Sequence, residues 1–280
     1  MTQRYAVKIA YIGKNYRGFQ RQETSIRTIE GEIETALSSL GIIKDFSSAR
    51  YTAAGRTDKG VHALSQVISF DSLRETIYLE EINQKLPDDV YAWGIAKVDN
   101  DFHARRAVKK RTYRYYINYS NEKLALMRKA LKKLIGTHDF VKLCKKPDDL
   151  SDGRPKSTVL TLVTAKVHLL RKKDILEFEF SSQSFLWHQV RKMVSLVLAI
   201  GKREFPVKAI DQALDPTSER LKRNSVLAPA EGLVLYKIEY SGIQFESSTK
   251  KIFYKEKILG ELNRYNSTLA VAQLMKKFLL

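Results

Sequence analysis

Hydrophobic residues along the first hundred positions follow two different periods. Apolar residues alternate with polar ones where strands are expected, and recur every three or four positions where helices are expected. Alternation or short apolar runs predict strands at residues 5–11, 51–54, 63–70 and 90–98. The helical period predicts helices at residues 29–40 and 79–86, which Gly41 and Pro87 end. The order of elements in this part is therefore β-α-β-β-α-β.

A similar order of elements follows a basic link at residues 105–111. Strands are predicted at residues 113–117, 159–169, 175–180 and 234–240. Helices are predicted at residues 124–134, 187–200 and 207–214, and Gly136 ends the first of them. We therefore predict an α+β fold of two split β-α-β units in tandem, each a sheet with helices on one face.

This order of elements divides the chain into three regions. Residues 1–104 form the first unit, residues 105–240 form the second, and residues 241–280 are an extension of unknown role. Within the second unit, the stretch KKPDDLSDGRPKS at residues 145–157 consists of turn formers and charges, which predicts an exposed loop. In the extension, residues 269–280 could form a small amphipathic helix.

The charge of the chain points to a polyanionic partner. The 280 residues include 49 Lys and Arg against 31 Asp and Glu, a formal net charge of +18. Nucleic acid is the first candidate and an anionic membrane surface the second. The longest apolar run, residues 193–200, is too short to span a bilayer, and the first residues lack the pattern of a signal peptide. Because one cysteine, Cys144, and five scattered histidines offer neither an internal disulfide nor a metal-ligand spacing, we expect a cytoplasmic protein without metal or cofactor.

A tight loop, GRTDKG at residues 55–60, joins two of the predicted strands. Its glycines permit a sharp turn, and Arg56 and Asp58 stand two residues apart at the tip, where a sheet could present them to a ligand. Asp58 could instead cap the backbone of its own turn, the common role of aspartate in such a sequence. Arg191, in a predicted buried helix, is a natural partner from the other half, because a buried guanidinium needs a carboxylate or phosphate. The alternative is that Arg191 lies at the rim and reaches water.

Aromatic and basic residues alternate around Tyr113, in the run KKRTYRYY. This interleaving suits unpaired or flipped nucleobases, because bases stack on the rings while the cations contact phosphates. Tyrosines packed in the core of a sheet are the alternative. His103 and Arg105, in the run DFHARR, could face phosphates or form a solvated basic turn. His62 and His188 could act as acid–base groups, but each is alone in its segment, which favours a structural role.

Several ordered motifs in this chain resemble the tRNA pseudouridine synthases of the TruA family. They cover roughly residues 3–240 and read AYIGKNYRGFQRQ, TIEGEIETAL, GRTDKGVHALSQV, DFHAR, RTYRYYI, GTHDF, SFLWHQVRKMV and EGLVLY. The resemblance implies two ferredoxin-like halves that form one extended, mainly antiparallel sheet, with the active cleft between them.

The resemblance also implies roles for individual residues and for the protein as a whole. Asp58 would be the catalytic aspartate, Arg191 its ion-pair partner, and Tyr113 the ring that stacks on the target uracil. Arg56 would enter the RNA and help to extrude the base. The implied enzyme is a homodimer that converts uridine to pseudouridine in the anticodon stem-loop of tRNA, at tRNA positions 38, 39 or 40, without metal or cofactor.

Two features depart from the family's pattern. Lys59 stands where many bacterial members have alanine, which leaves the set of target RNAs open. Neither the loop at residues 145–156 nor the stretch after Ser241 matches the pattern. Two rival functions fit the same residues: a catalytically silent RNA-binding protein or tRNA chaperone on this fold, and an RNA nuclease that uses Asp58 with His62.

Overall fold

The computed structural model describes residues 2–22, 26–145, 157–171, 174–218 and 227–247. Its strands are β1 (Gln3–Tyr11), β2 (Thr52–Ala53), β3 (His62–Ser72), β4 (Val90–Lys97), β5 (Lys110–Asn118), β6 (Gly136–Asp139), β7 (Val159–Leu170), β8 (Ile175–Ser182), β9 (Leu233–Glu239) and β10 (Glu246–Ser247). Its α-helices are α1 (Ile29–Ser39), α2 (Leu79–Lys85), α3 (Leu124–Leu134), α4 (Gln189–Gly201) and α5 (Ala209–Leu214). Within these ranges, no helix has the length and apolar character needed to cross a membrane.

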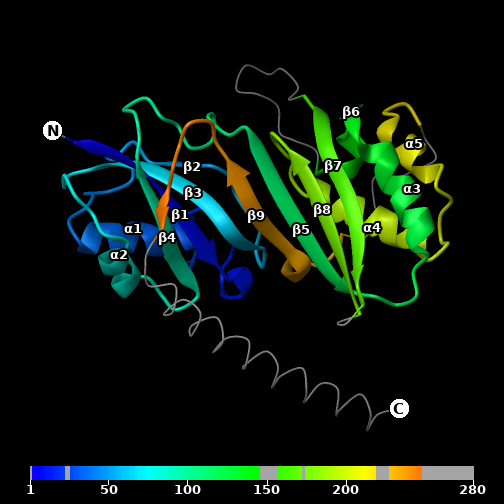
Figure 1. Ribbon diagram of the computed structural model, residues 1–280, viewed down its shortest axis with the longest axis horizontal. Coiled ribbons are helices and arrows are strands. Elements are labelled where there is room, and N and C mark those ends of the chain that lie inside the picture. Colours follow the sequence, from blue (N-terminus) through cyan, green and yellow to red (C-terminus); the bar gives the residue numbers. More distant parts are fainter. Residues whose placement is uncertain (1, 23–25, 146–156, 172–173, 219–226, 248–280) are drawn as a thin grey trace, which may run out of the picture.

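All ten strands of the described chain join one sheet, in the order β10-β4-β1-β3-β9-β5-β8-β7-β6, with β2 beside β3 (Figure 1). The first half contributes β4-β1-β3-β2 and the second half β9-β5-β8-β7. Numbered in chain order among its own four strands, with the short β6 left out, each set reads fourth, first, third, second, which is the strand order of a ferredoxin-like β-α-β-β-α-β unit. The predicted α+β fold of two tandem units forming one extended, mainly antiparallel sheet is therefore confirmed.

The two halves meet where β9 pairs with the start of β3. This pairing is parallel, with His62 opposite Val234 and Ala63 opposite Leu235. The other end of the same edge of β3 pairs with β2, through Thr52 opposite Ser69. Because β2 is only two residues long, the start of the same edge of β3 is open for pairing with β9 of the second half. The loop at residues 55–60, which lies between β2 and β3, is thereby placed at the junction (Figure 1).

The helices arise from the periodic apolar positions expected of them. In α1, Thr28 caps the first turn by accepting a hydrogen bond from the Gly31 N–H at 3.2 Å, and Ile29, Ile33 and Leu37 are buried. Acidic residues in the first turn stabilise α1 because they interact favourably with the positive end of the helix dipole. The predicted helices and strands are all present in the described ranges, with ends shifted by a few residues.

Two short strands were not predicted. β6 follows α3 directly, and Gly136, expected to end that helix, starts it with φ +113°. β10 pairs with β4, so the chain after β9 returns to the far edge of the first half. Most of the loop predicted at residues 145–157 and the helix predicted at residues 269–280 lie outside the described residues.

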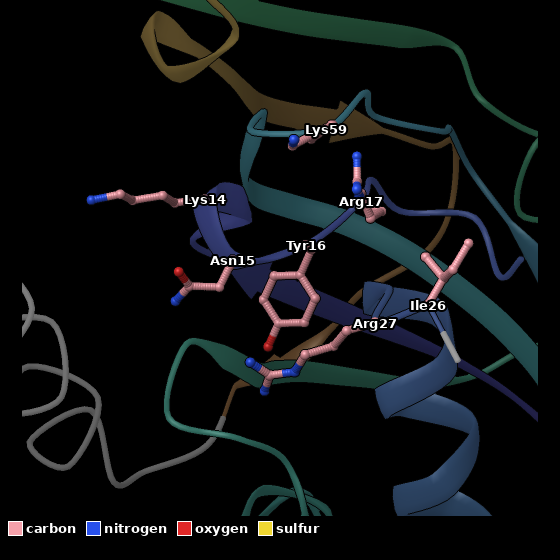
Figure 2. Close-up of a pocket in the computed structure, with 7 residues that line it drawn as sticks. All are labelled: Lys14, Asn15, Tyr16, Arg17, Ile26, Arg27 and Lys59. Atoms are coloured by element: carbon pink, nitrogen blue, oxygen red, sulfur yellow. The ribbon is translucent and has the colours of Figure 1, made fainter. Parts of the chain in front are cut away.

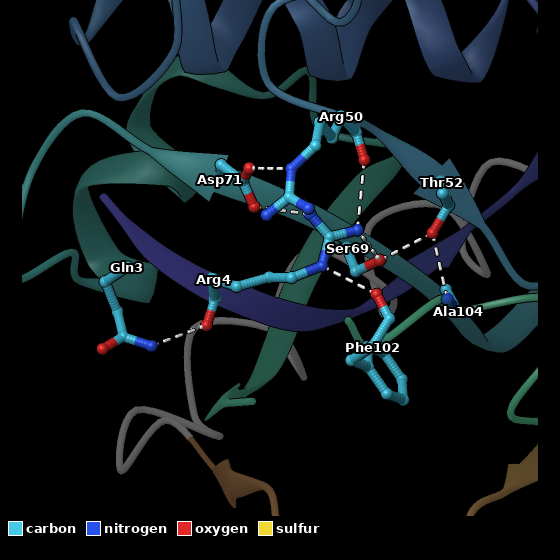
Figure 3. A network of polar contacts seen from close by, with 8 residues as sticks. All are labelled: Gln3, Arg4, Arg50, Thr52, Ser69, Asp71, Phe102 and Ala104. Carbon is cyan, nitrogen blue, oxygen red and sulfur yellow. Dashed lines mark hydrogen bonds and ion pairs between the residues drawn. The ribbon is translucent and has the colours of Figure 1, made fainter. Parts of the chain in front are cut away.

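A buried arginine fixes the link between the halves to the strands of the first half. Arg4 on β1 is 3% exposed, and its guanidinium donates to the Asp71 carboxylate at 2.5 Å and to the Phe102 carbonyl at 2.7 Å (Figure 3). Close by, the Ala104 N–H donates to the Thr52 hydroxyl at 3.0 Å. Because a buried guanidinium is stable only when its donors are satisfied, this network holds residues 102–104 against the sheet.

Candidate active site

The loop carrying Asp58 is held in a tight turn from both sides. The Val61 N–H donates to the Asp58 carbonyl at 3.1 Å, and Gly60 has φ +83°, a conformation that glycine adopts without strain. The preceding Thr57 is buried, where its hydroxyl lies 2.7 Å from the Tyr11 hydroxyl of β1. A Cβ at Gly13 would lie 2.0 Å from the Val61 carbonyl oxygen, so the segment after β1 packs directly on this loop. The backbone of the loop is therefore fixed, while Arg56 and Asp58 keep solvent-exposed side-chain surface.

The Asp58 carboxylate faces the start of α4 in the second half. Its Oδ2 lies 3.4 Å from Nη1 of Arg191 and 3.5 Å from Nε2 of His188. The Arg191 side chain is 12% exposed, and its Nε donates to the Ala228 carbonyl at 2.6 Å, which orients the guanidinium. The Asp58 side chain is 27% exposed, so a substrate can reach it. The structure thus places the predicted aspartate and arginine next to each other across the junction of the halves.

Tyr113 lies in β5 beside this group and is 8% exposed. Its ring meets the Phe185 ring edge-on, with centroids 5.1 Å apart. Burial raises the pKa of Tyr113 to about 12, Arg111 opposes that rise, and the charge of Asp58 adds to it. The hydroxyl is therefore protonated at neutral pH and within electrostatic reach of the carboxylate.

The other predicted RNA-contacting residues do not join this group. Arg56 is exposed at the loop tip. Burial raises the pKa of Glu30, and the charge of the nearby Arg56 partly opposes that rise. Arg105 is also exposed, and its N–H donates to Nδ1 of the partly buried His103 at 3.2 Å. Among the described residues, none of these three side chains contacts Asp58.

His62, which the nuclease hypothesis pairs with Asp58, faces elsewhere. Its Nδ1 accepts a hydrogen bond from the Gly13 N–H at 3.1 Å. Burial lowers the pKa of His62, and the nearby Glu231 opposes this. His62 therefore acts as a neutral hydrogen-bond acceptor that supports the loop, whereas His188, also expected to be structural, contacts the carboxylate.

A buried arginine that the sequence analysis did not single out ties the two halves together behind the site. Arg111 on β5 is 8% exposed, and its Nη2 donates to the Ala54 carbonyl of the first half at 2.5 Å. The same guanidinium donates to the carbonyls of Gln183 and Arg105. Since Ala54 immediately precedes the Asp58 loop, Arg111 couples the position of that loop to the second half. The sequence showed Arg111 only as one cation of a basic run.

A basic hollow adjoins the loop on the side of the first half. It has a volume of about 390 Å³, and Figure 2 shows its lining residues, which are Lys14, Asn15, Tyr16, Arg17, Ile26, Arg27 and Lys59. Tyr16 forms its floor: the hydroxyl donates to Asp89, and the Arg27 guanidinium lies 4.7 Å from the ring centroid. Lys59 directly follows Asp58 in the sequence, so the hollow and the carboxylate share one loop. Four cations around one hollow suit a phosphate group.

The group around Asp58 can support nucleophilic or proton-transfer chemistry. It combines a carboxylate, an adjacent guanidinium, an imidazole and a neutral phenol ring. In the part of the chain that the structure describes, no cluster of His, Cys, Asp or Glu could hold a metal ion.

Comparison with known proteins extends over nearly the whole chain. A protein from Thermococcus kodakarensis named tRNA pseudouridine synthase A is 36% identical over 276 residues, covering 98% of both chains. That match must include most of residues 241–280, so this relative has a counterpart of the extension. The loop at residues 145–156 lies within the same span.

Two further relatives and a family model agree with this match. Proteins named tRNA pseudouridine synthase A from Archaeoglobus fulgidus and Methanosarcina mazei are 39% and 41% identical, covering 87% and 85% of this chain and 86% and 84% of their own lengths. The family model described as tRNA pseudouridine synthase matches residues 7–119 and 130–241, which include every residue of the group around Asp58. This chain therefore belongs to the tRNA pseudouridine synthase family, and it is an isomerase.

Proposed function

We propose that this protein converts uridine to pseudouridine in the anticodon stem-loop of tRNA, at position 38, 39 or 40, with Asp58 as the catalytic group. The observation that carries the proposal is the placement of the Asp58 carboxylate, 3.4 Å from the Arg191 guanidinium and beside the buried ring of Tyr113. The three side chains come from two halves of the chain and converge at the junction of β3 and β9.

The proposed reaction requires few chemical groups beyond these three side chains. The bond between N1 of uracil and C1′ of ribose breaks, the detached base turns, and C5 of the base bonds to C1′. No electrons are gained or lost overall. Asp58 would either attack C1′ or remove the proton from C2′, and Arg191 would orient the carboxylate in both cases.

Holding the detached uracil is the role proposed for Tyr113. A target in a stem must first leave the helix, at a cost of a few kcal/mol, and the flipped base then needs a surface on which to stack. The ring of Tyr113 is fixed by its contact with Phe185. Arg56, exposed at the tip of the same loop as Asp58, would enter the RNA as the base leaves.

Binding of the tRNA backbone is supported by charge. The net charge of +18 favours a polyanion, and the basic hollow that includes Lys59 would bind a phosphate of the RNA. His103 and Arg105, on the link between the halves, would contact phosphates further along the RNA. We expect the enzyme to act in the cytoplasm as a homodimer, and light scattering that shows a monomer would contradict the dimer.

The test is to map pseudouridine in unmodified tRNA transcripts incubated with the purified protein. We expect pseudouridine at positions 38, 39 or 40 wherever the transcript has uridine there, and none in matched transcripts with cytidine at those positions. Pseudouridine elsewhere would contradict the proposed target. Intact tRNA that binds without acquiring pseudouridine would favour the RNA-binding function, and shortened tRNA would favour the nuclease.

A further inference from the structure

His188 occupies an unusual position at the start of α4. Its φ of +66° lies in the left-handed region, which residues other than glycine rarely adopt and which is frequent at functional sites. The ring packs on Trp187 with centroids 5.2 Å apart, and the side chain is 23% exposed. This conformation directs Nε2 to within 3.5 Å of the same Asp58 oxygen that Arg191 contacts.

The proposed reaction requires a base that Asp58 is poorly placed to supply alone. When C5 of uracil bonds to C1′, C5 still carries its own proton. That C5–H bond must break, its electron pair restores the C5–C6 double bond, and the proton goes to a base. N1, which left the sugar without a proton, gains one, so the protons balance. As the C5–C1′ bond forms, Asp58 is displaced from C1′ or returns the C2′ proton, so its carboxylate faces the sugar and a second group is needed beside C5.

Of the groups that the described residues bring to the carboxylate, His188 is the one available as a neutral base. Arg191 is a cation, and the Tyr113 hydroxyl, with a pKa raised to about 12, is already protonated. Burial is the main cause that lowers the pKa of His188; the cations Arg191, Lys145 and Lys192 lower it further, while Asp58 raises it. The imidazole is therefore uncharged at neutral pH and can accept a proton.

We propose, on the basis of the proposed function, that Nε2 of His188 accepts the proton that leaves C5 of the rejoined base. The geometry supports this because C5 must come to C1′, which lies beside the Asp58 carboxylate, and Nε2 contacts that carboxylate. The proton then passes from the imidazolium to N1 of the base or to water. Asp58 and His188 thus act on the sugar and on the base respectively.

Replacing His188 by asparagine tests this assignment. Asparagine tolerates left-handed backbone and can hydrogen-bond, but it cannot titrate. We expect the single-turnover rate on tRNA to fall about 100-fold, the usual contribution of a general base, with tRNA affinity retained. With 5-deuterouridine in the transcript, the variant should show a primary isotope effect larger than that of the wild type, because C5–H cleavage has become limiting. His168→Asn, on the exposed side of β7, should behave as the wild type.

A second variant separates chemistry from structure. Glycine also fits the left-handed conformation, and His188→Gly leaves space for a free base. Imidazole added to this variant should restore pseudouridine formation with a rate that follows the neutral imidazole. A rate loss without an isotope effect and without rescue by imidazole would overturn the assignment, as would a His188→Asn variant as fast as the wild type. A wild-type protein that forms no pseudouridine would instead overturn the proposed function, and this assignment with it.

Discussion

Replacing Arg111 by methionine removes the main polar link between the two halves behind the active site. The guanidinium is 8% exposed and donates to the carbonyls of Ala54, Gln183 and Arg105. The bond to Ala54 is fully buried at 2.5 Å, whereas the bond to Arg105 is long at 3.3 Å. Methionine fills much of the volume without offering a donor, so the carbonyls lose their partner while the packing is largely kept.

The magnitude follows from these contacts. A hydrogen bond from a charged donor contributes about 1.5–3 kcal/mol, and a buried carbonyl left without a partner costs about 1–3 kcal/mol. The Ala54 carbonyl takes the full cost, and the partly buried Gln183 carbonyl takes less. Burial lowers the pKa of Arg111, so keeping this guanidinium charged in the folded protein costs free energy. Methionine removes that cost, which offsets part of the loss. We therefore expect the free energy of unfolding to fall by about 3 kcal/mol.

Urea unfolding measures this loss as a lower midpoint at unchanged slope. Arg128→Met, an exposed arginine on α3, is the matched control and should change stability by less than about 0.5 kcal/mol. Because Ala54 leads into the loop of Asp58, pseudouridine formation by the Arg111 variant should fall even at temperatures where it remains folded. An Arg111→Met protein as stable as the Arg128 variant would refute the view that this guanidinium couples the halves.

Three further outcomes follow from the site. Tyr113→Phe should bind tRNA and form pseudouridine as the wild type does, since the stacking ring is kept and the hydroxyl has no assigned step, and a large loss of turnover would contradict this. Lys59→Ala and Arg17→Ala should each weaken tRNA binding and reduce the slope of log K against log salt by about 0.7–0.9, whereas Lys129→Ala, remote on α3, should leave the slope unchanged. Because burial lowers the pKa of His62, its contribution to stability is present above the unfolded value of about 6.5 and is lost as pH falls from there towards the folded pKa. Urea unfolding at pH 7.5 and 5.5 should therefore show less acid destabilisation in His62→Gln than in the wild type, and equal losses would contradict this reasoning.

Local patterns were sufficient to predict the longer elements of each half. The apolar positions of α1 appear in the structure as a buried face, because local periodicity and burial are linked directly, whereas β1, predicted from alternation, is buried on both faces. The short strands β6 and β10, of four and two residues, carry no usable period and depend on pairing with distant strands. The parallel pairing of β3 with β9 joins residues about 170 positions apart, and no local pattern encodes it.

The candidate site shows the same limit. Asp58 and Arg191 could be suggested as partners because a buried guanidinium needs an anion, and the structure places them 3.4 Å apart. His188 carried no such signal, since a single histidine before a helix is compatible with many roles. Only the left-handed turn at the start of α4 directs its ring to the carboxylate. Arg111 was likewise hidden in a basic run whose other members face solvent or pair at the surface.

The central claim is that the Asp58 carboxylate performs the chemistry, and Asp58→Asn tests it most directly. Asparagine preserves the size of the side chain and removes only its charge and basicity. Pseudouridine formed per enzyme in a tRNA transcript should fall to the level without enzyme, while the affinity for the same tRNA, measured by filter binding, is unchanged. Pseudouridine formation at the wild-type rate by Asp58→Asn would contradict the account.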